Sequence, residues 1–165
     1  GHHQGYLLLR CPGQQGLFFS GCRPLAPAWS LPLDVDPSWE FTPYGYSPDY
    51  PVNGGMHYGI DWGCPKGTPV LAVADGQVVV AGPDEPQGFP GVQAGAWGHY
   101  VQVSHADGTE SGYCHLSGIL VYVSEFVRRG RVIGYSGSTG RSTGPHLHLQ
   151  SFRNGKRVDP TGFLV

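Results

Sequence analysis

Short runs of apolar and β-branched residues alternate with turn-forming pairs along most of the chain. Residues 68–74 and 77–81 are two such runs, and Asp75-Gly76 joins them. An Asp-Gly pair between alternating apolar residues is the strongest short-range signal for a β-hairpin. The pattern therefore predicts that these two segments are paired antiparallel strands.

A second hairpin is predicted where residues 99–104 and 110–115 flank Asp107-Gly108. Further strand-like runs lie at residues 121–127, 132–135 and 145–152. None of these runs has the length and period that predict an amphipathic helix. Short strands separated by turns at intervals of about ten residues predict an all-β fold, built as an antiparallel sheet or sandwich.

The beginning of the chain has a different pattern. Residues 1–28 show neither a helical period nor strand alternation, so we interpret them as an N-terminal extension with no assigned role. Residues 29–51 are dense in proline and aromatic residues, which predicts an extended, irregular segment that packs its rings on the domain surface. We therefore expect a single domain at residues 29–165.

The composition favours a folded, turn-rich protein over a disordered one. Glycine and proline contribute 27 and 15 of the 165 residues, but aromatic residues make up 12% and the net charge is only −2. Disordered chains are usually aromatic-poor and strongly charged. Ten basic residues against twelve acidic ones give no basic field for phosphate, so we expect no nucleic-acid partner. The apolar stretch at residues 6–9 is too short for a membrane span, and we expect a monomer.

The cysteines do not fix a pairing. Cys11, Cys22, Cys64 and Cys114 allow three full pairings and include no Cys-x-x-Cys spacing. A Cys11–Cys22 bond closing a small loop would imply an oxidising compartment, whereas buried thiols fit the sequence equally well.

Eight histidines stand out in a chain with only 13% charged residues. His57 and Asp61 lie in a glycine-rich stretch that disfavours a helix, and on a straight strand they would be about 13 Å apart. A bend at Gly59 would bring the imidazole and the carboxylate together as two ligands of a zinc ion. Taken alone, this spacing is a weak motif.

Three more histidines extend the pattern. His146 and His148 would point to the same face of a strand, about 6.6 Å apart, so that one could bind the metal and the other lie beside its open position. The alternative is a pair of surface histidines on an amphipathic strand. His115 ends a predicted strand and should share a face with Tyr113, with Cys114 on the opposite face.

The remaining candidates have simpler interpretations. His99 and His105 lack partner spacing, so we assign them to packing or to supporting hydrogen bonds. Tyr58 and Trp62 are expected to be walls of a cleft or part of the core.

Together, these segments resemble the lysostaphin and LytM type of zinc endopeptidases. The resemblance covers residues 29–165, and its segments occur in the family's order. They are residues 53–61 (NGGMHYGID), 67–70 (GTPV), 113–116 (YCHL), 137–140 (GSTG) and 145–148 (PHLH).

The resemblance implies an antiparallel β domain of the duplicated hybrid motif type, with a narrow groove. It implies a Zn²⁺ ion bound by His57, Asp61 and His148. It also implies cleavage of peptide bonds in the stem or cross-bridge of bacterial peptidoglycan. Such a protein is expected to be secreted or associated with the cell wall, or to be carried by a phage.

The resemblance further implies that His115 and His146 are catalytic histidines that do not bind the metal. One of them would take a proton and return it to the leaving amine, while the other would help to stabilise the developing negative charge. Tyr50 matches the family tyrosine that faces the oxyanion. The sequence leaves open which histidine is the base.

Three alternatives remain at this point. A non-catalytic binding or activator module of the same fold should lack at least one of the five polar positions, all of which are filled here. A zinc D-Ala-D-Ala carboxypeptidase has similar elements, but its first ligand pair is spaced more widely. A structural module of a phage is compatible with the N-terminal extension.

Overall fold

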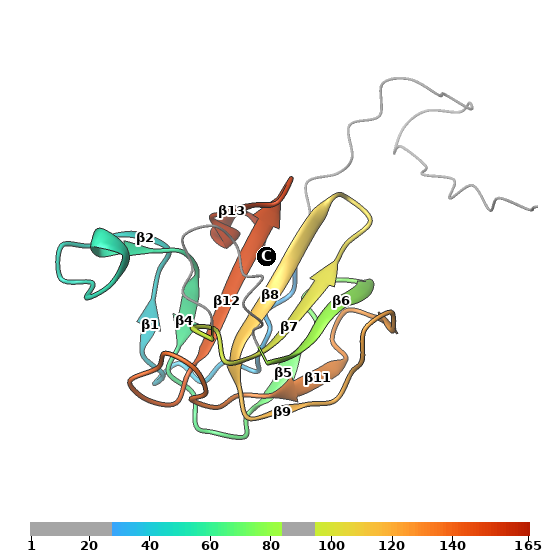
Figure 1. The fold of residues 1–165 in the computed structure, drawn as a ribbon, viewed down its shortest axis with the longest axis horizontal. Helices are drawn as coiled ribbons and strands as arrows, with labels where there is room; N and C mark the ends of the chain where they lie inside the picture. The colour runs from blue at the N-terminus through green and yellow to red at the C-terminus, as the bar shows by residue number, and fades with distance from the viewer. Residues whose placement is uncertain (1–27, 84–94) are drawn as a thin grey trace, which may run out of the picture.

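The computed structural model describes residues 28–83 and 95–165. The described part of the chain folds into antiparallel strands and two short 3₁₀ turns, with no α-helix among these residues (Figure 1). The prediction of an all-β antiparallel fold is therefore confirmed. In the same residues, no helix has the length and apolar character needed to cross a membrane.

The strands form one large sheet and two small ones (Figure 1). The large sheet has the order β1 (Phe41–Thr42), β4 (Ile60–Trp62), β12 (Leu147–Arg153), β8 (Thr109–Leu116), β7 (His99–Ser104), β6 (Gly76–Pro83) and β10 (Phe126–Val127), and β13 (Lys156–Val158) also pairs with β12. The second sheet has the order β5 (Pro69–Leu71), β11 (Val132–Tyr135) and β9 (Gly118–Ile119). Strands β2 (Gly45–Tyr46) and β3 (Met56–His57) form a pair, and the 3₁₀ turns are η1 (Asn53–Gly55) and η2 (Pro160–Phe163).

The main hydrophobic core joins one face of the large sheet to the three-stranded sheet. Leu147 and Leu149 of β12 belong to this core together with Val70 of β5 and Ile133 of β11. Because side chains alternate along a strand, this burial leaves His148 on the opposite face of β12. The alternation of the sequence thus selects the face on which the polar residues gather.

One predicted hairpin is confirmed and the other is wrong. Strands β7 and β8 pair across the second Asp-Gly turn as expected. The segments on either side of the first turn do not pair, because β5 lies beside β11 and β6 lies beside β7 and β10. Between them the backbone crosses from one sheet to the other: Ala72 donates to the carbonyl of Arg131, and Val73 donates to the hydroxyl of Tyr113.

The proline-rich segment also differs from its prediction at one end. Trp29 is 1% exposed and belongs to the core, where its ring lies 4.8 Å from that of Phe163. A parallel bridge joins Trp29 to Leu164, so the segment begins against the C-terminal end of the chain. Phe41 and Tyr46 do lie on the surface, as predicted.

The cysteines occupy separate environments. Cys64 is a buried thiol of the main core, and Cys114 is buried in a second cluster on the other face of the sheet. These two cysteines are not bonded to each other. Cys11 and Cys22 lie outside the described residues.

A buried chain of hydrogen bonds connects His105 to the interior. Its Nδ1 lies 2.7 Å from the carbonyl of Asp75, and its Nε2 lies 2.9 Å from Ser111 Oγ, which is 2.9 Å from the hydroxyl of Tyr113. That hydroxyl already accepts from the amide of Val73. In this chain Ser111 donates its hydroxyl proton to the oxygen of Tyr113, so this oxygen accepts from both Ser111 and Val73.

We expect acid to destabilise the protein through His105. Burial lowers the pKa of His105 despite the opposing effect of the Asp75 carbonyl. The unfolded chain therefore takes up this proton near pH 6.5, and the folded chain only at lower pH. The free energy of unfolding should have its full value above about pH 6.5 and should fall as the pH drops toward the pKa of the folded state. Across this interval, the melting temperature of His105→Gln should depend less on pH than that of the parent protein. Equal slopes in the two proteins would contradict this.

Candidate metal centre

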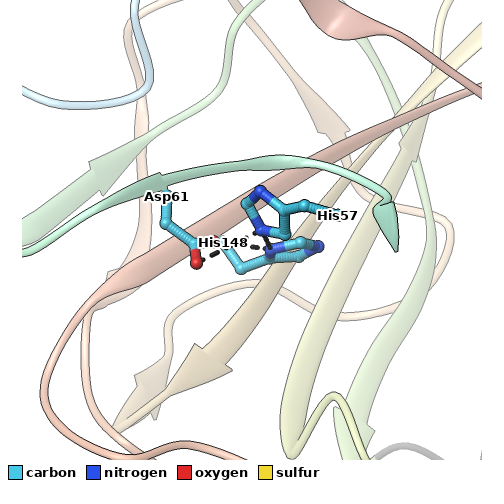
Figure 2. A group of neighbouring side chains, drawn as sticks. All are labelled: His57, Asp61 and His148. Carbon is cyan, nitrogen blue, oxygen red and sulfur yellow. Dashed lines mark hydrogen bonds and ion pairs between the residues drawn. The ribbon is translucent and has the colours of Figure 1, made fainter. Parts of the chain in front are cut away.

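Three side chains from three strands converge on one point at the open face of the large sheet. His57 ends β3, Asp61 is in β4 and His148 is in β12, where it is the register partner of Asp61. The Nε2 atom of His57 lies 3.2 Å from Oδ2 of Asp61 and 3.3 Å from Nδ1 of His148, and this Nδ1 lies 2.6 Å from Oδ1 of Asp61. Figure 2 shows the two rings and the carboxylate pointing toward one another. The structure thus brings together the three residues that the family resemblance implied as metal ligands.

The donor set fits a zinc ion. Nδ1 of His57 lies 2.8 Å from the carbonyl of Pro43, and donating to it leaves the lone pair of Nε2 directed at the site. Around a tetrahedral ion with bonds of about 2.0–2.1 Å, neighbouring ligand atoms lie about 3.3 Å apart. The separations of His57 Nε2 from its two partners match this value. Two nitrogens and one carboxylate, with a fourth position open, are typical of catalytic rather than structural zinc.

The electrostatics of the three groups also favour a cation. Burial opposes ionisation of Asp61, but hydrogen bonds from His148 and His57, together with their charges, hold its pKa well below the usual range. Burial would lower the pKa of His57, but the hydrogen bond and charge of Asp61 outweigh it and raise this pKa. A partly buried, ionised carboxylate between two imidazoles can bind a divalent cation in place of a proton.

Glycine is required at position 59 because the ring of His148 and the backbone of Leu149 lie very close to it. A Cβ atom built on Gly59 would lie 2.5 Å from the ring of His148 and 2.5 Å from the carbonyl of Leu149. Its φ is not in the left-handed region, so space rather than backbone conformation excludes a side chain. The break between β3 and β4 that the sequence predicted at this position lets His57 and Asp61 meet.

His146 lies beside the cluster of His57, Asp61 and His148 without joining it. Its Nδ1 lies 2.8 Å from the carbonyl of Gly144 and 3.2 Å from Ser142 Oγ, and donating to the carbonyl leaves Nε2 as an acceptor. This Nε2 lies 3.9 Å from Oδ2 of Asp61. The ring of His146 is thus held close to the candidate metal site.

His115 reaches the site by a route that alternation did not predict. The residue of β8 in register with His148 is Cys114, so alternation places Cys114 on the sheet face of His148, where it is buried, and would place His115 on the opposite face. His115 has a φ of 63°, which turns its side chain away from the core face of Tyr113 and into the groove. The expectation that His115 shares a face with Tyr113 is wrong. Such φ values are uncommon for non-glycine residues and cluster at functional sites.

The environment of His115 keeps it neutral. Burial and the charges of His148 and His146 lower the pKa of His115 to about 4. Its Nδ1 lies 2.7 Å from the carbonyl of Thr139, so Nε2 is left as a proton acceptor. The rings of His115 and His146 are 4.6 Å apart between centroids. His115 and His146 therefore form a pair of rings beside the candidate metal ligands.

The groove around these residues has a volume of about 390 Å³. Tyr50 forms part of its wall, with its ring 4.9 Å from that of His57. Burial and the charge of Asp61 raise the pKa of Tyr50, although Arg141 opposes them, so its hydroxyl stays protonated. Tyr58 also lines the groove, as one of the two interpretations of the sequence predicted.

Sequence reasoning missed two arginines of the groove. Arg141 and Arg157 both line it, one from the loop before His146 and the other from β13. Neither lies in a spacing that marks a site, so no local pattern could have identified them. His99, by contrast, is exposed at the start of β7 and does not line the groove.

Comparison with known sequences gives a family and close relatives. The model of peptidase family M23 matches residues 55–160, which include His57, Asp61 and His148. Lysostaphin of Staphylococcus simulans is 44% identical over 128 residues, which cover 73% of this chain and 24% of lysostaphin. The DD-carboxypeptidase/endopeptidase Mpg of Neisseria meningitidis serogroup B is 43% identical over 110 residues, which cover 67% of this chain and 23% of Mpg. The chain thus spans about a quarter of the length of these curated relatives.

Comparison with solved structures agrees. The catalytic domain of lysostaphin from S. simulans matches with a TM-score of 0.65 and 38% identity, covering 76% of this chain and 91% of that domain. A zinc-containing peptidase from Vibrio cholerae matches with a TM-score of 0.63 and 31% identity, covering 84% of this chain and 40% of the other.

Proposed function

The chain belongs to peptidase family M23, and on this premise we propose that it is a zinc-dependent endopeptidase that cuts peptide bonds in the stem or cross-bridge of bacterial peptidoglycan. The observation that carries the proposal is the convergence of His57 Nε2, the Asp61 carboxylate and His148 Nδ1 at the groove. The relatives named lysostaphin and DD-carboxypeptidase/endopeptidase support the class of substrate. The resemblance drawn from the sequence segments is confirmed at the level of the family.

We assign the zinc ion to His57, Asp61 and His148. Two imidazoles and one carboxylate form a donor set common in catalytic zinc sites. When bound, the ion lowers the pKa of a water molecule toward neutrality and polarises the scissile carbonyl. The zinc content of the structural relative from V. cholerae supports this choice of metal.

The other polar side chains of the groove supply proton transfer and charge stabilisation. His115 and His146 each donate from Nδ1 to a backbone carbonyl, so each offers Nε2 as a proton acceptor. One takes a proton from the attacking water and returns it to the leaving amine. The other would carry a proton on Nε2 and donate it as a hydrogen bond to the substrate oxygen, as the protonated hydroxyl of Tyr50 does, so that both stabilise the negative charge that develops there.

A second candidate activity is the release of a terminal residue. The relative Mpg carries both carboxypeptidase and endopeptidase in its name. Both activities need the same metal site and differ in whether the groove accepts a peptide chain on both sides of the cleaved bond. Analysis of the products distinguishes them, because a carboxypeptidase releases single D-Ala whereas an endopeptidase cuts within cross-linked peptides.

The domain division follows the same proposal. We assign residues 29–165 to the catalytic domain, since the described strands and all the proposed site residues fall within it. Residues 1–28 are assigned to an extension outside it. A substrate in the cell wall implies that the enzyme acts outside the cytoplasm, whether secreted, wall-associated or delivered by a phage.

Metal removal tests the proposed function directly. Incubation with purified cell walls of different cross-bridge chemistry should release muropeptides. Treatment with a chelator should abolish release, and added zinc should restore it, because without the ion no water is activated near pH 7. Mass spectrometry of the products identifies the bond that is cut. Undiminished release in the chelated protein would refute a metal-dependent mechanism.

A further inference from the structure

Arg157 is a half-buried cation in the wall of the groove. Its guanidinium carbon lies over the Tyr58 ring, 4.0 Å from the ring centre, which is within the range of a cation–π contact. Arg157 is in β13 and is the register partner of Phe152 in β12. Phe152 lies on the same strand face as His148, so Arg157 faces the side of the sheet that carries the metal ligands.

No carboxylate of the described residues lies within ion-pair distance of Arg157. Arg128 and Arg131, by comparison, face Asp75 and Glu125. The titratable groups that act on the charge of Arg157 are Tyr58, Tyr44, Cys114 and Tyr100. These groups are ordinarily uncharged near pH 7. A partly desolvated cation without a carboxylate is costly, and an anionic ligand would offset that cost.

The other charges of the groove do not supply this anion. Asp61 is held by His57 and His148, and Glu40 lines the groove without forming an ion pair with Arg157. Arg141 lines the groove as a second cation. The groove therefore carries two guanidinium groups in a chain whose net charge is −2.

The position of Arg157 suits a peptide whose cleaved bond lies at the metal site. The backbone of Arg157 is level with Phe152, which is four residues from His148 along β12. Its guanidinium lies on the ring of Tyr58, the residue after His57, and all three residues line the groove. A peptide held in the groove with its cleaved bond at the metal site would therefore bring a group within a few residues of that bond to the guanidinium.

From this geometry we infer that Arg157 and the Tyr58 ring form a subsite for a carboxylate of the peptide substrate. A guanidinium fork binds a carboxylate through two parallel hydrogen bonds, and such charge-assisted pairs are stronger than neutral ones. The carboxylate is either the terminal group of a peptide or an acidic side chain within it. This inference rests on the proposed function, because it names the peptides that the groove prefers.

Binding of short peptides tests the subsite. Acetyl-tetraglycine with a free carboxylate and its C-terminal amide form one pair, and acetyl-Gly-Gly-Gly-Glu-amide and its Gln counterpart form another. Each is titrated by NMR into the zinc-loaded protein carrying His115→Ala, so that binding is measured without turnover. In at least one pair, the carboxylate peptide should bind about 10- to 100-fold more tightly than its amide. A difference within the tetraglycine pair indicates that the subsite binds a terminal carboxylate, and a difference within the Glu/Gln pair indicates that it binds an acidic side chain.

Two variants then test whether the difference in affinity depends on Arg157. Arg157→Gln should reduce the ratio of the carboxylate and amide affinities to about one, whereas Arg153→Gln should leave this ratio unchanged. Arg153 is a matched control, because it lies in the same β12–β13 hairpin and stacks on Phe163 instead. If Arg157→Gln does not fold, Arg157→Lys is used, and it should lose part of the ratio because an ammonium cannot form the two parallel bonds.

The outcomes separate this inference from the proposed function. Equal affinities within both peptide pairs, or a ratio that persists in Arg157→Gln, would overturn the carboxylate subsite even if cell walls are cleaved. Failure to cleave any wall preparation would overturn the endopeptidase, and the peptide affinities would still decide whether Arg157 binds a carboxylate.

Discussion

Replacing His57 with alanine should abolish zinc binding and peptide hydrolysis together. The variant loses one of three ligands, and the hydrogen bond from its Nδ1 to the carbonyl of Pro43 is lost as well. A water molecule without the metal has a pKa near 15.7 instead of about 7, so the nucleophile is lost at neutral pH. We expect kcat/KM to fall by on the order of 10⁴-fold or more, and bound zinc to fall from about one equivalent to near zero.

A matched histidine outside the groove serves as the control. His99 is exposed at the start of β7, and His99→Ala should retain both zinc and activity. Zinc is measured by atomic emission after gel filtration, and activity by release of muropeptides. If His57→Ala keeps one equivalent of zinc and cleaves normally, the assignment of this ligand is wrong.

Replacing His115 or His146 with alanine should separate catalysis from metal binding. Neither ring is among the three proposed ligands, so zinc content should be unchanged in both variants. General acid–base catalysis contributes about 10²- to 10⁴-fold, and kcat should fall within this range. The loss should appear mainly in kcat rather than KM, because proton transfer occurs in the transition state.

The pH profile identifies the base. The variant that lacks the proton acceptor should lose the acidic limb of the kcat/KM profile that the parent enzyme shows. The variant that lacks only the stabilising imidazole should keep this limb at a reduced rate. Parent-like rates and profiles in both variants would remove His115 and His146 from the mechanism.

Much of the fold could be predicted from local patterns. The hairpin between β7 and β8 is encoded by an Asp-Gly turn and two alternating segments, all within 18 residues. The pairing of β5 with β11 joins segments about 60 residues apart, and no local signal marks it. Asp75-Gly76 therefore resembled a hairpin turn, although the chain there passes from one sheet to another.

The site was predictable in its chemistry and less so in its geometry. The spacings of His57, Asp61 and the His-x-His pair identified the donor types, and glycine between the first two allowed the required bend. Spacing alone could not decide between His146 and His148 as the third ligand. Antiparallel register favours His148, because His148 lies opposite Asp61 and His146 lies beyond the end of that pairing.

The sequence by itself determined an all-β chain with an imidazole-rich, carboxylate-containing site, because strand alternation, turn residues and ligand types are properties of short segments. Only the tertiary structure decided how these segments meet. The left-handed φ of His115 reverses the face predicted by alternation, and the β12–β13 hairpin brings Arg157 to the groove. Both depend on contacts between residues distant in the sequence, whose packing overrides local preference.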